Sequence, residues 1–206
     1  MKKSGLIFII AMFVFTGKVL IADSPVTSTD FYKAYLQIEQ VQRAEQHGIL
    51  DGHLAGYLLD ESVSIDKKAA VINALAGKEK VKNNAVTFKM FLARKYGSTH
   101  KELNLDLLNG DDLFCLGYLT VADDYSNAGE ALPILERAKE KNAKSYTVNI
   151  IFALTQAQIY VNNSDKCSAW TVCDKVRNDA SLNQDLDPYA IDIIFGYIDK
   201  YKENCK

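Results

Sequence analysis

Proline and histidine are scarce in this sequence, and catalytic signatures are missing from it. The 206 residues include 3 Pro and 3 His. No Gly-x-Ser-x-Gly elbow, His-Glu-x-x-His pair or Walker loop occurs, and no histidine lies near a cysteine in the sequence. These patterns supply a nucleophile, a zinc site or a phosphate cradle in many enzymes. The sequence therefore predicts a protein that is not an enzyme and that needs no cofactor.

Positive charge is also limited. The chain carries 24 Lys and Arg against 26 Asp and Glu, for a net charge of −2. No basic stripe follows one face of a predicted helix, as binding to a phosphate backbone requires. We therefore expect neither nucleic acid nor an anionic membrane surface as a partner.

The one strong targeting signal lies at the N-terminus. Lys2 and Lys3 precede an apolar run from Leu6 to Phe15, and Ala22 offers a small residue for cleavage before Asp23. This layout is typical of a secretory signal peptide. An uncleaved membrane anchor is the alternative, but the apolar run falls short of the roughly 20 residues that span a bilayer. Residues 1–22 are therefore predicted to be a signal peptide, and the protein to be exported to the periplasm or beyond.

Cleavage would leave a chain of one domain. Removing 1–22 takes away three lysines and no acid, which leaves 21 basic and 26 acidic residues and a net charge of −5. We expect residues 23–29 to form a short disordered lead and residues 30–206 to form a single α-helical repeat domain. No later segment is long and apolar enough to span a membrane.

Apolar residues recur with a period of 3.6 along nearly the whole mature chain, which predicts an all-α fold. Turn residues and helix caps divide this pattern into about nine helices. Their expected ranges are 30–47, 51–60, 65–77, 83–96, 111–125, 129–141, 145–161, 165–177 and 188 to near the C-terminus.

Parts of the sequence repeat. Gly56-Tyr57-Leu58 recurs as Gly117-Tyr118-Leu119, and a second echo at a shift of 35 matches Leu119-Thr120 to Leu154-Thr155. Ala131-Leu132 followed by Ala138 resembles the second helix of a tetratricopeptide unit. That resemblance implies an antiparallel helix-hairpin array, a tetratricopeptide-like superhelix with a concave binding face, and it implies no chemistry. We therefore expect an exported, non-catalytic protein of the cell envelope that binds or scaffolds a protein or peptide partner.

A second resemblance suggests an alternative function. Cys115, Gly117-Tyr118 and Asp124 are similar to a motif of exported helical immunity proteins that are paired with type VI secretion amidase toxins. The family's cysteine soon after this helix is missing here. The resemblance implies a periplasmic immunity or inhibitor protein that blocks a secreted toxin.

Three clusters of polar residues are candidate sites. His47, Asp51 and His53 are weak candidates for metal ligands, but Gly48 and Gly52 interrupt them, so a solvated helix end is the favoured interpretation and no metal is expected. Asp123-Asp124 with Asn127 resembles the aspartate-rich helix of terpene synthases, although a helix end explains the pair as well. Three amides lie in an apolar helix and either face a ligand groove or bond to neighbouring loops: Asn149, Gln156 and Gln158.

The four cysteines predict one disulfide and leave a second open. In one helix, Cys167 and Cys173 would lie about 9 Å apart along the axis, which is too far for a bond. A short connection between the last two predicted helices favours antiparallel packing and brings Cys167 beside Cys205. Cys115 and Cys173 fall on apolar faces and are expected to be buried; whether they bond to each other stays open.

Overall fold

The computed structural model describes residues 24–76 and 83–206. All regular structure in these two ranges is helical, apart from an isolated bridge between Ser145 and Asn183. The predicted all-α fold class is therefore confirmed. None of the helices in the two ranges has the length and apolar character that crossing a membrane requires. The predicted signal peptide, together with Asp23 and Gly77, lies outside the described residues.

Nine α-helices and four short 3-10 helices follow one another along the described residues. They are η1 (Phe31–Tyr35), α1 (Glu39–His47), α2 (Gly52–Leu59), α3 (Ile65–Leu75), α4 (Asn84–Lys95), η2 (Leu105–Leu107), α5 (Gly110–Asp123), η3 (Tyr125–Asn127), α6 (Ala128–Lys141), α7 (Tyr146–Asn162), α8 (Lys166–Arg177), α9 (Pro188–Ile198) and η4 (Asp199–Asn204).

Side-chain caps start several of these helices at the predicted positions. The side chain of Asp51 accepts a hydrogen bond from the backbone of Leu54, and Ser145 and Asp165 make equivalent bonds at α7 and α8. Asp187 caps α9, whose first residue is Pro188. Each cap satisfies a backbone N–H that the helix itself leaves without a partner.

The predicted helix over 30–47 is wrong in one respect, because the structure divides it into η1 and α1. Asp30 makes no capping hydrogen bond and pairs with Lys33 instead. The hydroxyl of the buried Tyr35 accepts a hydrogen bond from the backbone N–H of Asp187, which ties η1 to the start of α9. The two elements pack differently: η1 contacts both α3 and α9, and α1 contacts α3.

The expectation of a disordered lead over 23–29 is also wrong for the described residues 24–29. Ser24, Val26 and Thr29 are buried. The Ser24 hydroxyl donates to Oε1 of Gln158 on α7 at 2.7 Å, and the Thr29 hydroxyl donates to the backbone carbonyl of Pro25. The polar composition of this segment suggests disorder, but its hydroxyls are satisfied within the fold.

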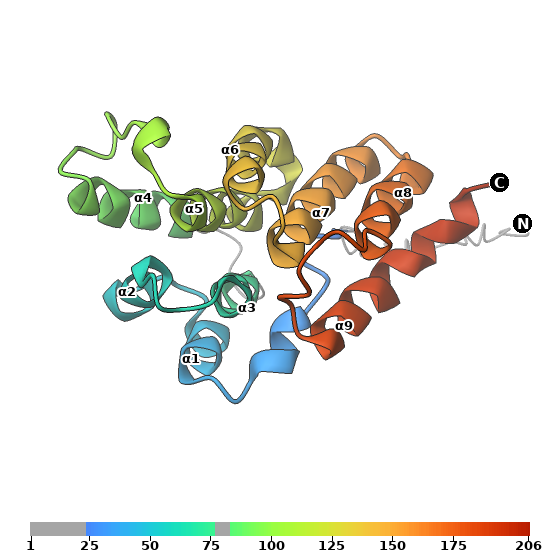
Figure 1. The fold of residues 1–206 in the computed structure, drawn as a ribbon, viewed down its shortest axis with the longest axis horizontal. Helices are drawn as coiled ribbons and strands as arrows, with labels where there is room; N and C mark the ends of the chain where they lie inside the picture. The colour runs from blue at the N-terminus through green and yellow to red at the C-terminus, as the bar shows by residue number, and fades with distance from the viewer. Residues whose placement is uncertain (1–23, 77–82) are drawn as a thin grey trace, which may run out of the picture.

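Two helix hairpins form the upper layer of the molecule in Figure 1: α5 with α6, followed by α7 with α8. The echo at a shift of 35 places Thr120 and Thr155 at equivalent positions of α5 and α7. Each hydroxyl donates to the carbonyl four residues earlier, at 2.8 Å in Thr120 and 2.9 Å in Thr155. The other repeat, in which Gly56-Tyr57-Leu58 recurs 61 residues later as Gly117-Tyr118-Leu119, is not matched in packing. Gly117 lies against Leu135, whereas a Cβ on Gly56 would meet nothing within 4 Å.

The third helix fills the space beside α5 and α7. Residues 68–75 of α3 are all buried, and α3 contacts both helices. Asn73 links three elements, because its Oδ1 accepts from the Tyr32 backbone and its Nδ2 donates to the Tyr118 hydroxyl. Among the described residues, α3 therefore covers the side of α5 and α7 that it packs against, so that side forms no open concave face of the kind that the tetratricopeptide resemblance implies.

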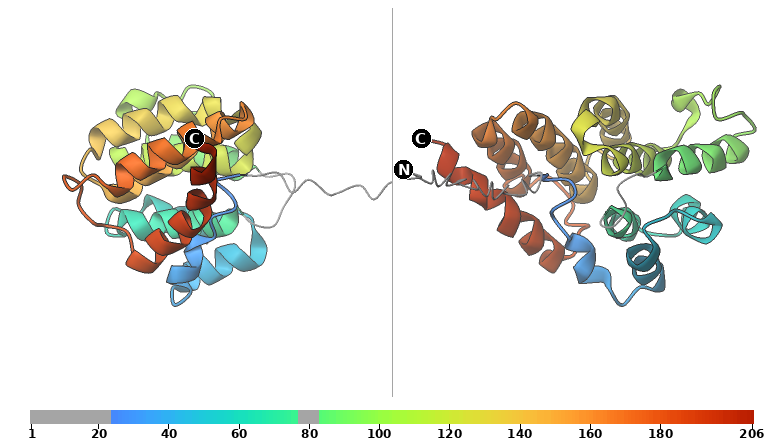
Figure 2. Two further views of the ribbon diagram at one scale, coloured as in Figure 1. Left: turned by 90° about the vertical axis from the view of Figure 1, so that its right-hand side faces the viewer. Right: turned by 180° about the vertical axis from the view of Figure 1, so that it is seen from behind.

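A disulfide fastens the C-terminus to α8. It joins Cys167 to Cys205, with Cα atoms 4.8 Å apart, and this is the pair that the packing argument selects. The contact with α8 comes mainly from η4, which continues α9. In Figure 2, α9 also lies beside η1, so an N-terminal and a C-terminal element of the described chain pack together.

Candidate functional site

The side chains of His47, Asp51 and His53 are not grouped as the ligands of a metal ion would be. His47 and His53 are both exposed, whereas Asp51 caps α2 and accepts hydrogen bonds from Arg43, the closer at 2.5 Å. Burial opposes ionisation of Asp51, but the bonds from Leu54 and Arg43 outweigh it and lower its pKa. In 24–76 and 83–206, no group of three or more His, Cys, Asp and Glu side chains is placed to hold a metal ion.

The paired aspartates at the end of α5 act on neighbouring helix starts. Oδ2 of Asp123 accepts from the backbone N–H of Ala85, in the first turn of α4, at 2.8 Å. Asp124 caps η3 by accepting from the backbone and hydroxyl of Ser126. These contacts explain the two aspartates by bonds to backbone N–H groups, whereas the Asn127 amide donates to Glu130.

Of the residues behind the immunity-protein resemblance, Cys115, Gly117 and Tyr118 lie in the core, whereas Asp124 is exposed. Cys115, Gly117 and Tyr118 are on α5, where both Cys115 and Tyr118 are buried and Gly117 packs on α6. Cys173 is buried in α8, and both it and Cys115 are free thiols. Burial raises the pKa of each thiol far above its usual value, which keeps the reactive thiolate form scarce.

Two partly buried ion pairs that sequence reasoning missed join α3, α4 and α5. Nζ of Lys68 lies 3.0 Å from Oδ2 of Asp111, and Nζ of Lys95 lies 2.9 Å from Oδ2 of Asp112. The Tyr96 hydroxyl also donates to Asp112 at 2.7 Å. Consecutive aspartates in the first turn of a helix look like dipole partners in sequence, and nothing local shows that lysines reach them.

The first groove on the surface lies between α4, α5 and α6; we call it the α4 groove. It has a volume of about 300 Å³ and is lined by Ala85, Val86, Lys89, Leu105, Leu116, Thr120, Asp123, Glu130 and Ile134. Aliphatic side chains make its floor and walls, and Lys89, Asp123 and Glu130 contribute charge of both signs. Its volume is at the small end for ligand sites, which suits a few side chains of a partner.

Exposed apolar side chains gather around this groove. Val86 is 51% exposed, and Met90, one turn later on α4, is 50% exposed. Leu107 of η2, two residues after Leu105 in the groove wall, is 64% exposed. Ile49 is 60% exposed and lies between Gly48 and Leu50, which both bond to the Asn84 side chain at the start of α4. Apolar patches of this kind mark interaction surfaces more often than isolated exposed residues do.

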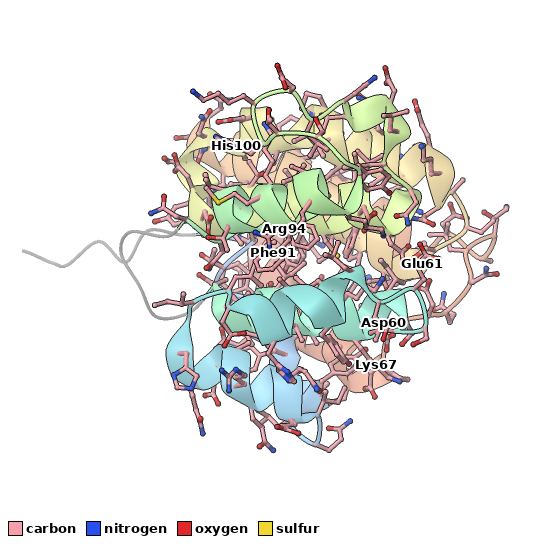
Figure 3. All side chains as sticks on the ribbon, turned by 90° about the vertical axis from the view of Figure 1, so that its left-hand side faces the viewer. Asp60, Glu61, Lys67, Phe91, Arg94 and His100 are labelled. Carbon is pink, nitrogen blue, oxygen red and sulfur yellow. A yellow bond between two sulfur atoms is a disulfide. The ribbon has the colours of Figure 1, made fainter. Side chains whose placement is uncertain are left out.

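Figure 3 views the end of the molecule where α2 and α4 lie one above the other. Phe91 lies between these helices, and a Cβ on Gly52 of α2 would lie 3.7 Å from its ring. The Arg94 guanidinium lies 5.8 Å from the centre of the same ring. Phe91 thus joins α4 to the layer below it, while Val86 and Met90 have no such covering layer among the described residues.

A second groove lies between α6 and α8, with α7 as its floor; we call it the α7 groove. It has a volume of about 490 Å³ and is lined by Lys139, Ala143, Asn149, Phe152, Ala153, Gln156, Val172, Lys175, Val176, Asp179, Ser181 and Leu182. Two of the three amides singled out in the sequence bond elsewhere: Asn149 to the carbonyls of Ala143 and Ser145, and Gln158 to Ser24 and Asn162. Gln156 lines the groove.

Both grooves are lined by apolar side chains together with a few polar and charged ones. Their linings, which belong wholly to the described residues, contain no histidine and no cysteine. What both offer is apolar surface with a charged rim, a combination suited to binding. No protein-family model matches the chain, and comparisons with curated proteins and with solved structures find no match.

Proposed function

We propose that this chain is an exported, non-catalytic helical-repeat protein of the cell envelope that binds a protein or peptide partner through the α4 groove. The partner inserts apolar side chains between α4 and η2, and its polar groups meet Lys89, Asp123 and Glu130 at the rim. Binding energy then comes mainly from apolar area removed from water, at about 25 cal/mol per Å².

The observation that carries the proposal is the exposure of Val86 and Met90 beside the groove. Half of each side chain faces solvent, on one face of α4. Polar or charged residues are the commoner choice at such positions in a helix that only water covers. A partner that covers them would bury the apolar stripe that this fold leaves open.

The equivalent threonines of α5 and α7 support a tetratricopeptide-like arrangement. Their spacing of 35 residues is close to the 34-residue period of tetratricopeptide units. The two hairpins α5/α6 and α7/α8 fit that arrangement, with α3 in the place where such arrays hold a ligand. In this proposal the ligand surface has moved from the concave side to the α4 groove.

Export is supported by the N-terminal pattern and by the disulfide. Disulfides persist in oxidising compartments and are rare in the cytosol of most cells. We expect a mature chain that begins at or near Asp23. Its first residues already belong to the packed fold, because Ser24 is buried against α7. N-terminal sequencing of the natural protein tests this, and an intact Met1 in a cytoplasmic fraction would contradict it.

The binding proposal is tested by comparative capture. Tagged full-length protein, with residues 1–22 in place, is expressed in its own host, cross-linked in the envelope and purified, and its partners are identified by mass spectrometry. The test variant carries Val86→Glu and Met90→Glu, which place two charges beside the groove. The control carries Tyr189→Glu, at a side chain that is 60% exposed and lies on α9.

We expect one partner to be recovered with the wild type and the Tyr189→Glu control but lost with the double variant. Circular dichroism melts establish that all three proteins are equally folded. Recovery of the same partners with all three proteins would show that the α4 groove is not the binding surface.

A further inference from the structure

We propose that the α7 groove binds an acidic amphipathic helix of a partner protein. The groove runs along one stripe of α7, formed by Asn149, Phe152, Ala153 and Gln156. These positions follow the i, i+3, i+4, i+7 spacing of a single helical face. The side walls come from α6 and α8, so an occupant would lie along α7 between two flanking helices, as a helix lies in a groove.

The floor of the groove supplies the apolar contact. Phe152 and Leu182 line it and are 7% and 8% exposed, so each still presents an edge to the groove. Val172 and Val176, one turn apart on α8, form one wall and are only partly buried. An apolar stripe on the occupant would therefore have aromatic and aliphatic partners on two sides.

The charges on the rim favour an occupant that carries negative charge. Lys139 lies on the α6 side, with its ammonium 4.7 Å from the centre of the Phe152 ring, and Lys175 lies on the α8 side. Within 24–76 and 83–206, neither lysine has a carboxylate within 4.0 Å. The one acid of the lining, Asp179, accepts from the backbone of Ser181. The lining thus carries a net charge of +1 on a chain whose net charge is −2.

The side chain of Gln156 is available to form a hydrogen bond with an occupant of the groove. Its amide lies half-buried in the groove and has no hydrogen-bond partner in the part of the chain that the structure describes. A primary amide offers both donors and an acceptor. It can therefore bond to a carboxylate or a backbone group of the occupant, beside the two lysines.

Binding of a designed helix tests the proposal. The probe is a fluorescein-labelled 18-residue helical peptide with leucine at i, i+3, i+4 and i+7 and glutamate on both flanks of that stripe. A matched peptide carries lysine in place of every glutamate. Fluorescence anisotropy with the mature protein is measured at low and high salt, because contacts between exposed charges weaken with ionic strength.

We expect the glutamate peptide to bind and the lysine peptide to bind at least about tenfold more weakly, with the difference shrinking in high salt. Lys139→Ala combined with Lys175→Ala should weaken the glutamate peptide by about tenfold or more. The control, Lys67→Ala combined with Lys101→Ala, removes the same charge from exposed positions outside the groove and should change little. Val172→Glu should abolish binding by placing an acid in the wall.

Three results would overturn the proposal: no binding of the glutamate peptide, equal binding of both peptides, or equal losses in the two double-lysine variants. This test is independent of the α4 groove, because Val86→Glu with Met90→Glu should leave the glutamate peptide's affinity unchanged. A loss with that variant instead would place the peptide in the α4 groove.

Discussion

Gly117 of α5 lies so close to Leu135 of α6 that a side chain has no room between them. A Cβ on Gly117 would lie 2.7 Å from Cγ of Leu135 and 3.2 Å from its backbone nitrogen. Leu135 is fully buried, so it has no free space into which to withdraw. The glycine therefore sets the distance between the two helices of this hairpin.

Gly117→Ala should destabilise the protein even though alanine favours helices. The added methyl forces α5 and α6 apart, which costs about 1–3 kcal/mol, while the gain in helix propensity returns at most about 1 kcal/mol. We expect a net loss of about 1–2 kcal/mol in the free energy of unfolding in urea. Gly56→Ala is the matched control, because its Cβ would meet nothing within 4 Å. It should stabilise the protein by about 0.5–1 kcal/mol.

Helix starts could be predicted from sequence where the signal is local. Asp187 with Pro188 combines a capping side chain with a residue whose missing N–H is not needed at the first position, and α9 begins there. The break between η1 and α1 could not be predicted in this way. It depends on Tyr35 reaching the backbone of Asp187, far along the chain, and an apolar stripe shows no trace of that contact.

The two grooves also could not be predicted from local sequence patterns, because they too depend on how distant helices pack. Val86 and Met90 have the spacing of core residues, and the sequence does not show which apolar face the fold leaves uncovered. Gln156 could be marked as an amide in an apolar helix, but so could Asn149, which bonds to a nearby loop. Both line the α7 groove, and only the bonds of Asn149 to the Ala143 and Ser145 carbonyls separate the two.

The disulfide should contribute strongly to stability. It closes a loop between residues separated by 38 positions, for which the chain-entropy model gives about 4 kcal/mol. We expect Cys205→Ser to lower the free energy of unfolding by about 3–4 kcal/mol. A reductant should destabilise the wild type by a similar amount and leave the variant unchanged. Non-reducing peptide mapping should recover the Cys167–Cys205 peptide, and thiol titration of the unfolded protein should find Cys115 and Cys173.

The C-terminal segment should also make stability depend on pH. Both oxygens of Asp199 are bonded to Arg177, and Trp170 donates to Oδ1. The bond from Arg177 lowers the pKa of Asp199 below its ordinary value of 3.8. A carboxyl with a lowered folded-state pKa stabilises the fold above its unfolded value and loses that contribution as the pH falls through the folded value. The contribution should therefore be present at pH 7 and decline below about pH 4.

Thermal melts of the wild type and Asp199→Asn between pH 7 and pH 2 measure this contribution. The variant should be less stable than the wild type at pH 7, and the two should converge at the acid end. Added salt should narrow the difference, because Asp199 is partly exposed and its charge is screened. A constant difference across the whole range would show that the loss at pH 7 is due to packing and not to the charge.

The two partners of the Lys68–Asp111 pair should differ in how much the fold depends on them. The Lys68 side chain is 1% exposed, whereas that of Asp111 is 31% exposed. Asp111→Asn leaves a buried ammonium without its countercharge, which should cost about 2–3 kcal/mol, below the usual range for a fully buried pair because water still reaches this site. Lys68→Met removes the buried charge and fills its space, while the remaining carboxylate stays solvated, so its cost should be below about 1 kcal/mol.

Combining Lys68→Met with Asp111→Asn should cost much less than Asp111→Asn alone, because the ammonium is then gone. Urea unfolding of the three variants measures these differences, and a larger loss for Lys68→Met than for Asp111→Asn would mean that the pair's packing, and not the buried charge, determines its contribution.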